Sequence, residues 1–124
     1  RGLVVVFFDW DMTTLGVPRI DVGTLLGYWP EASDPPERLA IAMQPTYLEG
    51  FPTRREVVER YAARSGRDLG AIAFFETFAL FKLAVVLQQI FVRFVRGQTK
   101  DERFAAMGES VRRLAESASA TRTD

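Results

Sequence analysis

Residues 71–92, AIAFFETFALFKLAVVLQQIFV, determine what kind of fold this chain can adopt. Their length and apolar character predict a helix over roughly 70–96 that ends at Gly97. A membrane span needs about 20 predominantly apolar residues, but Glu76, Lys82 and two glutamines interrupt this stretch, and its longest unbroken apolar run is residues 83–87. We therefore expect no membrane span but the central buried helix of an α-helical bundle.

Helix signals on both sides of this stretch predict further helices. A short helix is expected over residues 20–29, with Leu25, Leu26 and Trp29 facing inward, and another at about 37–43. Residues 53–56 (TRRE) form a capping box that opens a helix ending near Gly66, and residues 99–102 (TKDE) form a second that opens a helix to about residue 118. Their expected apolar faces are Val57, Val58, Tyr61 and Ala62 in the first, and Phe104, Met107, Val111, Leu114 and Ala118 in the second.

Residues 3–8, LVVVFF, are typical of a β-strand buried on both faces. One strand does not make a stable sheet alone. We expect it to pair either with a portion of the protein upstream of Arg1 or with another copy of this chain. The first residue, Arg1, agrees with the expectation that the chain is a piece of a longer protein.

The composition excludes several classes of function. The 124 residues are 48% hydrophobic and 26% charged, which is typical of a soluble globular protein, with a disordered tail expected at 119–124. Sixteen basic residues balance sixteen acidic ones, so no nucleic acid or anionic membrane is expected as a partner. The absence of Cys and His excludes cysteine nucleophiles and histidine-based catalysis or metal binding. No signal peptide is apparent and Arg far outnumbers Lys, so we expect a cytoplasmic, bacterial protein.

The chemistry is concentrated directly after the expected strand, at Asp9-Trp10-Asp11. Carboxylates beyond the end of a buried strand lie where α/β folds bind ligands, and two of them suit Mg²⁺, which prefers oxygen ligands. The alternative interpretation is that both are loop acids in Asx-type turns. A strand followed by Asp-x-Asp also resembles the haloacid-dehalogenase phosphatase signature, but that resemblance covers only residues 9–13 and lacks the later strands of that family.

A longer resemblance covers roughly residues 3–100. The segment VVVFFDWDMTTLGVPRIDVGTLLGYWPEASDPP resembles the region after the catalytic loop in aminoglycoside-phosphotransferase-like proteins, and most closely the phosphotransferase domain fused to some acyl-CoA dehydrogenases. Residues 51–69 and 75–98 resemble the same branch. The resemblance implies a mainly α fold: residues 1–118 would be the C-terminal helical portion of a protein-kinase-like large lobe, with one N-terminal β-strand.

The resemblance also implies roles for single residues. Asp9 matches the aspartate that binds Mg²⁺ and with it ATP, Asp11 replaces the usual Glu as a second metal-binding candidate, and Asp21 matches the aspartate that supports the catalytic loop. The alternative for Asp21 is a plain N-cap. The small lobe and the His-Gly-Asp catalytic loop of the family are absent from this sequence, so no catalytic base is expected here and the chain alone should be inactive.

These features imply an ATP-dependent phosphotransferase acting on a hydroxyl of a small molecule, either a hydroxyacyl-CoA-like metabolite or an aminoglycoside-like compound. Lys82 and Arg93 belong to a basic stripe on the long helix and are candidates for binding an anionic group of the substrate, although a solvated face explains the stripe equally simply. The alternative function is a non-catalytic helical module for interaction or assembly. We expect a homo-oligomer or pairing with the upstream portion.

Overall fold

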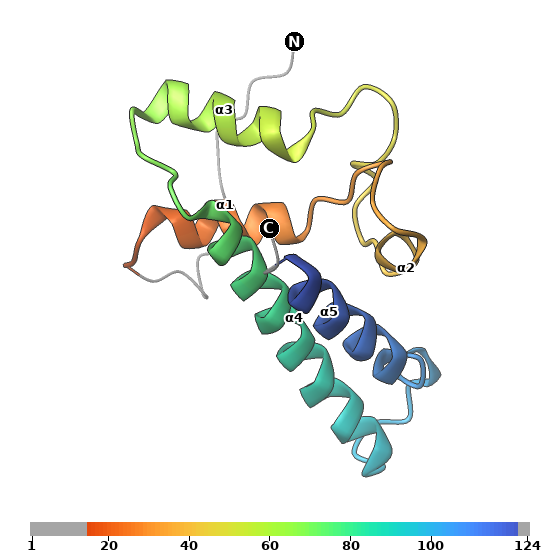
Figure 1. Cartoon of the computed structure of the whole chain (residues 1–124). Coiled ribbons are helices and arrows are strands. Elements are labelled where there is room, and N and C mark those ends of the chain that lie inside the picture. The colour runs from red at the N-terminus through yellow and green to blue at the C-terminus, as the bar shows by residue number, and fades with distance from the viewer. Residues whose placement is uncertain (1–14, 122–124) are drawn as a thin grey trace, which may run out of the picture.

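The computed structural model describes residues 15–121, and every regular element in that part of the chain is helical (Figure 1). The elements in order are α1 (Pro18–Gly27), α2 (Pro36–Leu39), α3 (Arg54–Ser65), α4 (Ile72–Val95), the 3-10 turn η1 (Glu102–Phe104) and α5 (Met107–Thr121). The mainly α fold predicted from the sequence is confirmed. The strand predicted at residues 3–8 lies outside the described residues.

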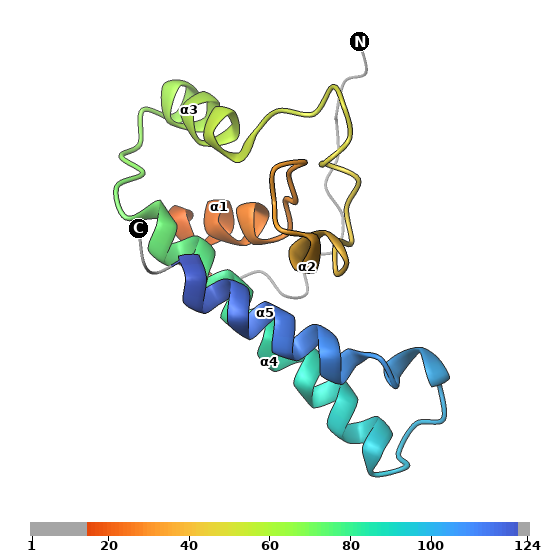
Figure 2. The ribbon, with the colours of Figure 1, turned by 45° about the vertical axis from the view of Figure 1, so that its right-hand side comes forward.

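Helices α4 and α5 form an antiparallel pair that contains the larger core. Both views show α5 running back alongside α4 (Figures 1 and 2). Leu80 and Leu87 of α4 pack with Leu114 and Ala118 of α5, and all four side chains are buried. Burying one leucine stabilises a fold by about 1.5–3 kcal/mol, so this seam is a major part of the packing. The apolar stripe predicted for the last helix is confirmed at its buried positions.

Helix α1 lies between α3 and the α4–α5 pair, and two glycines let it approach α4 closely (Figure 2). A Cβ atom on Gly23 would lie 2.6 Å from backbone and Cβ atoms of Phe75, and one on Gly27 would lie 3.1 Å from Cβ of Ala79. Leu26 is buried, but Leu25 is 46% exposed, so the prediction that Leu25 faces inward is wrong. The glycine face, rather than a leucine face, meets α4.

Helix α3 begins and ends where the sequence predicted. The Thr53 side chain accepts from the Glu56 backbone N–H and the Glu56 carboxylate accepts from the Thr53 backbone N–H, which completes the capping box. At the other end, Gly66 adopts φ 65°, the left-handed conformation that ends helices. The predicted apolar face packs against Val22 and Leu26 of α1 and against Leu69.

The second predicted capping box is wrong. Asp101, not Thr99, is the N-cap residue, because its carboxylate accepts hydrogen bonds from both the backbone N–H and the guanidinium of Arg103. This arrangement closes only the short turn η1, and α5 starts at Met107. Helix α5 then continues to Thr121, so it includes residues assigned by the sequence to a disordered tail.

Helix α4 is buried on one face only, which corrects the expectation of a helix buried all round. It is long and apolar enough to cross a membrane by length and composition, and only 22% of its most apolar 18-residue window is buried. Phe74, Phe81 and Val95 are 64%, 56% and 66% exposed. In the part of the chain that the structure describes, these apolar residues therefore form an outer face and are not enclosed by a bundle.

A cluster of two arginines and three carboxylates joins the segments between these helices. Arg54, at the start of α3, donates to both carboxylate oxygens of Asp34, at 2.9 and 2.7 Å. It also pairs with Glu31 at 3.1 Å. Arg38 of α2 donates to Glu76 of α4 at 3.0 Å and lies 3.3 Å from Asp34. The cluster therefore ties the loop after α1, α2, α3 and α4 together.

Most of this cluster is shielded from water. The side chains of Asp34, Arg38 and Arg54 are 5%, 11% and 19% exposed. Removing one member of a buried ion pair leaves an unpaired charge and is strongly destabilising. No buried side-chain nitrogen or oxygen among the described residues lacks a hydrogen-bond partner. The cluster is thus complete as it stands, and each member depends on the others.

We expect Arg54→Met to lower the free energy of unfolding by about 3 kcal/mol, because Asp34 and Glu31 would keep their charges without the main cation that neutralises them. Urea unfolding at neutral pH measures this. The matched control is Arg55→Met, since the neighbouring Arg55 side chain is 82% exposed and pairs only with Glu59 at the surface. That control should cost less than about 1 kcal/mol. Equal effects of the two substitutions would contradict the assignment of the cluster as a structural tie.

We also expect stability to fall in acid through Asp34. Burial raises the pKa of Asp34, but hydrogen bonds from Arg54 and from the Glu31 backbone and the charges of Arg38 and Arg54 outweigh it, so the pKa lies below its ordinary value of 3.8. A lowered pKa in the folded state means that this contribution is present above about pH 4 and is lost as the pH falls through the folded value. Unfolding of the wild type should therefore show a steeper loss below about pH 4 than unfolding of Asp34→Asn. Parallel pH profiles of the two proteins would contradict this.

Candidate functional site

The residues expected to hold Mg²⁺, Asp9 and Asp11, lie outside the described residues, and so does most of the loop around them. What the structure shows is how the chain leaves that loop. Val17 is the N-cap residue of α1 in extended conformation, and Pro18 is the first helical residue, a position that suits the fixed φ of proline. Helix α1 therefore starts seven residues after Asp11, without the capping hydrogen bond that a polar side chain would give.

The start of α1 is fastened to the loop before α4. The Arg19 guanidinium donates to the backbone carbonyl of Asp68 and to its carboxylate, each at 2.9 Å. The Asp68 carboxylate in turn accepts from the Gly70 backbone N–H. The phosphotransferase-like proteins that this sequence resembles usually have an apolar residue at the position of Arg19. Here it gives a polar contact between two segments 49 residues apart, and its exposure limits its contribution to about 0–1 kcal/mol.

Asp21 lies in the first turn of α1 and is exposed. It is not the N-cap residue, which is Val17, so the plain N-cap alternative from the sequence is wrong. A carboxylate in the first turn interacts favourably with the helix dipole, by about 0.3–1 kcal/mol. Its role as support for a catalytic loop stays a prediction, since the sequence holds no such loop.

Lys82 and Arg93 are both exposed side chains on α4. Eleven residues separate them, which is about 16 Å along the helix axis at 1.5 Å per residue. One phosphate or carboxylate group therefore cannot contact both of them. If both bind a substrate, they bind two separate anionic groups of an extended molecule. Their role in substrate binding stays a prediction.

The exposed charged residues of α4 are all cationic. Its single acidic residue is Glu76, which is turned into the buried ion-pair cluster with Arg38 and Arg54. Lys82, Arg93 and Arg96, the last at its C-terminal end, are all exposed. The electrostatics of this helix therefore favour an anionic ligand over a polycation.

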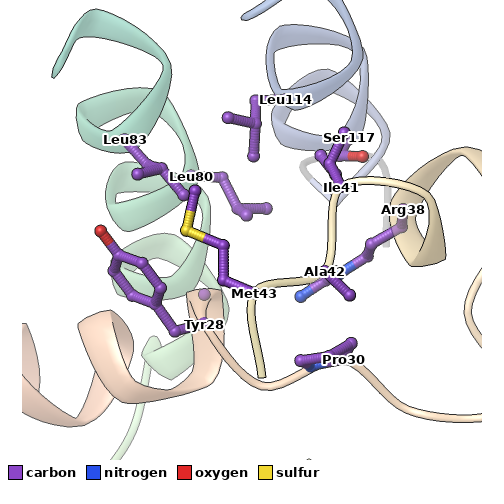
Figure 3. Close-up of a pocket in the computed structure, with 11 residues that line it drawn as sticks. Tyr28, Pro30, Arg38, Ile41, Ala42, Met43, Leu80, Leu83, Leu114 and Ser117 are labelled. Atoms are coloured by element: carbon purple, nitrogen blue, oxygen red, sulfur yellow. The ribbon is translucent and has the colours of Figure 1, made fainter. Parts of the chain in front are cut away.

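In the described part of the chain, two hollows of very different size lie near Tyr28 and Trp29, just after α1. The first, shown in Figure 3, has a volume of about 30 Å³ and lies between Tyr28, Met43, Leu80 and Leu114. It has room for about one water molecule, whereas ligand sites usually have about 300–1,000 Å³. This cavity is therefore a packing gap between the loop after α2 and the α4–α5 core, and no substrate site.

The second hollow is an open groove of about 420 Å³ between Trp29 and α3. Its apolar wall consists of Trp29, Pro52 and Tyr61, and Trp29 is fixed because its indole N–H donates to the Pro52 carbonyl at 2.9 Å. Arg60 and Arg64 of α3 also line the groove. Sequence reasoning missed this groove, although the spacing of four between the two arginines places them on the same face of α3.

Among the described residues, no group of three or more His, Cys, Asp or Glu side chains could hold a metal ion. Three carboxylates do lie in one ion-pair cluster, those of Glu31, Asp34 and Glu76. Arg38 and Arg54 already neutralise them. The resemblance implies one metal ligand at Asp9, a second candidate at Asp11 and a further ligand upstream of Arg1. The carboxylate oxygens of Asp9 and Asp11 are the donor type that Mg²⁺ prefers, so these residues fit the metal chemically.

The chain is similar to two acyl-CoA dehydrogenase family members. It is 29% identical to acyl-CoA dehydrogenase family member 11 of Rattus norvegicus and 30% identical to that of Mus musculus, in both cases over 117 residues. It is 30% identical over 118 residues to acyl-CoA dehydrogenase family member 10 of Mus musculus. These matches cover 91–94% of this chain but only 11–15% of each relative. No protein-family model and no solved structure matches the chain.

The related proteins thus carry the name of an enzyme family, and this chain corresponds to a small part of each of them. The similarity agrees with the branch that the sequence motifs indicated, in that both concern proteins named after acyl-CoA dehydrogenases. The phosphotransferase activity expected from the motifs is a separate question.

Proposed function

We propose that this chain is the C-terminal helical part of an ATP-dependent phosphotransferase that acts on a hydroxyl group of a small molecule. The observation that carries the proposal is the run from Asp9-Trp10-Asp11 through Asp21 to Tyr28-Trp29, and the helical structure of residues 15–121 agrees with the helical portion that the resemblance implies. Similarity over 91% of the chain to proteins named as enzymes supports it. By itself the chain should transfer no phosphoryl group, because it has neither a catalytic base nor a small lobe.

In this proposal Asp9 and Asp11 hold Mg²⁺ together with the phosphates of ATP. The ion would neutralise charge on the phosphate oxygens during transfer. The described part of the chain would fix the position of the motif: Pro18 starts α1 seven residues after Asp11, and Arg19 connects that start to the loop before α4. Gly23 then sets α1 against the backbone of α4. The motif would therefore be held at a fixed place relative to the helices that face the substrate.

The charges on α4 favour an acyl-CoA-like metabolite over an aminoglycoside as substrate. Aminoglycosides are polycations, and the exposed charged residues of α4 are Lys82, Arg93 and Arg96. A hydroxylated acyl-CoA carries several anionic groups along an extended molecule, which suits two cationic side chains about 16 Å apart along the helix. The acyl-CoA dehydrogenase names of the relatives support the same choice.

In a full-length protein that contains this segment, we expect Asp9→Asn to lower kcat by about 10³-fold or more, because the substitution removes a charge that would hold Mg²⁺ against the phosphates. Steady-state ATP turnover with a hydroxyacyl-CoA measures this. The control is Glu59→Gln, since the Glu59 side chain is 61% exposed on α3 and pairs with Arg55 at the surface. Activity of the Asp9 variant within a few fold of the wild type would show that the metal assignment is wrong.

In the same enzyme, we expect Lys82→Met to raise KM for an anionic hydroxylated substrate by about tenfold and to leave KM for ATP within about twofold, because it removes a charge used in substrate binding alone. Lys100→Met is the matched control, since Lys100 is the other lysine of the chain and is exposed in the loop after α4. Unchanged KM values for the Lys82 variant would mean that the basic stripe is only a solvated face.

A further inference from the structure

The exposed side of α4 carries a regular row of seven side chains. They follow one another at alternating intervals of four and three residues, and we call them the α4 seam: Phe74, Phe78, Phe81, Val85, Gln88, Val92 and Val95. An average interval of 3.5 residues is the pattern by which one helix packs along another. Six of the seven are exposed, and the seventh, Val92, is half-buried.

The seam lies on the side of α4 turned away from the core. At about 100° per residue, Phe81 and Val85 point roughly opposite to Leu83 and Leu87, which contact the core of the α4–α5 pair. Helix α1 meets α4 at Phe75 and Ala79, to one side of the seam. Neither α1 nor α5 therefore covers this row.

The exposed area of the seam is large enough for a stable interface. Its three phenylalanines are 64%, 42% and 56% exposed, which corresponds to roughly 300 Å² if a fully exposed phenylalanine offers about 200 Å². With the valines, two such faces together approach the roughly 1,000 Å² that a specific interface needs. A monomer rarely exposes a continuous apolar patch of this size without a use for it.

The chemistry of the seam fits a second copy of itself. It contains no charged residue between Phe74 and Val95, and its single polar member, Gln88, has an amide that both donates and accepts. Two glutamines facing each other can therefore pair symmetrically, as a two-fold interface requires. A lone polar residue in such a row commonly fixes the register and number of helices.

The charges beside the seam also allow self-pairing in the parallel direction. In a parallel pair, Lys82 of one copy faces Thr77 of the other, and Arg96 faces Phe91. No cation faces another cation across the pair. Exposure to lipid is a poorer explanation of the seam, because a lipid-facing helix needs no interval of 3.5 residues and leaves Gln88 without a partner.

We propose that the α4 seam is a self-association surface through which two copies of this chain form a parallel helix pair, with Gln88 facing Gln88. The inference concerns a different process from the proposed phosphoryl transfer and is tested separately from it, although Lys82 flanks the seam at about 60° around α4 from Val85.

The absence of cysteine from the chain makes a direct test possible. In a parallel pair, helices 8–10 Å apart bring equivalent seam Cα atoms to about 4–6 Å, within the range of a disulfide. Under mild oxidation, Gln88→Cys and Val95→Cys should therefore each give a covalent dimer. The control is Val86→Cys, a position of the same helix that is 45% exposed but about 100° from Val85 and off the seam. It should stay largely monomeric on a denaturing gel.

The two seam positions distinguish the direction of pairing. An antiparallel pair centred near Gln88 would bring the two copies of residue 88 within reach of each other but hold the two copies of residue 95 about 21 Å apart along the axis. Cross-linking of Gln88→Cys without Val95→Cys would thus overturn the parallel pairing. Cross-linking of the Val86 control as readily as the seam variants would overturn the seam itself.

Sedimentation equilibrium on the 124-residue chain tests the energetic role of the seam. We expect a dimer, and we expect Phe81→Glu to raise its dissociation constant by about tenfold or more. Leu48→Glu, a similar change at a residue 53% exposed in a loop, should alter it by less than about threefold. Circular dichroism checks that both variants keep their helices. A monomer at all concentrations, or a dimer that Phe81→Glu does not weaken, would overturn the proposal, and so would partition of the wild type into phosphatidylcholine vesicles.

Discussion

The arrangement of these helices depends on the buried ion-pair cluster around Arg54. Its guanidinium donates two hydrogen bonds to the Asp34 carboxylate and also neutralises Glu31. Arg38 forms ion pairs with both Asp34 and Glu76 of α4. Burying such charges is expensive, and attraction compensates only when the geometry is good. The cluster lies where the proline-containing loop after α1 offers few apolar side chains, so charge pairing replaces apolar packing as the tie between α3 and α4. A displacement of either helix would leave at least one buried charge unpaired.

The second constraint is that α4 is apolar on both its inner and its outer face. Its inner face supplies Leu80, Ala84 and Leu87 to the core, while its outer face exposes three phenylalanines. The apolar content of a helix determines how much of its surface is stabilised by burial, but it does not determine which partner buries that surface. Within residues 15–121, α1 and α5 cover only the inner half. The apolar side chains of the outer half would therefore gain stability only from a surface outside residues 15–121 that removes them from water.

Local chemistry explains which features could be predicted from the sequence. The capping box at Thr53 and the stop at Gly66 are decided by neighbouring residues, so α3 was predicted almost to the residue. The second capping box failed because Asp101 competes with Thr99 as N-cap and Arg103 reinforces Asp101, a preference that the four-residue pattern does not contain. The buried face of α1 depends on the glycines that meet α4, and glycines carry no apolar signal. The hydrogen bonds of the arginine cluster join residues 20 to 38 positions apart, so no local pattern predicts them.

The candidate site also combines features that local sequence predicts with features that depend on tertiary contacts. The Asp9-Trp10-Asp11 pattern and its family resemblance predict a magnesium site, with loop acids in Asx-type turns as the alternative, and the site stays a prediction because both residues lie outside the described part of the chain. The contacts that fix α1 are tertiary: Arg19 reaches Asp68 across 49 residues, and Gly23 fits against Phe75. In the proposed enzyme, a substitution in α4 would therefore disturb the motif by moving α1. The described helices would act on the proposed chemistry through such packing, and the buried ion-pair cluster around Arg54 would serve the same structural purpose.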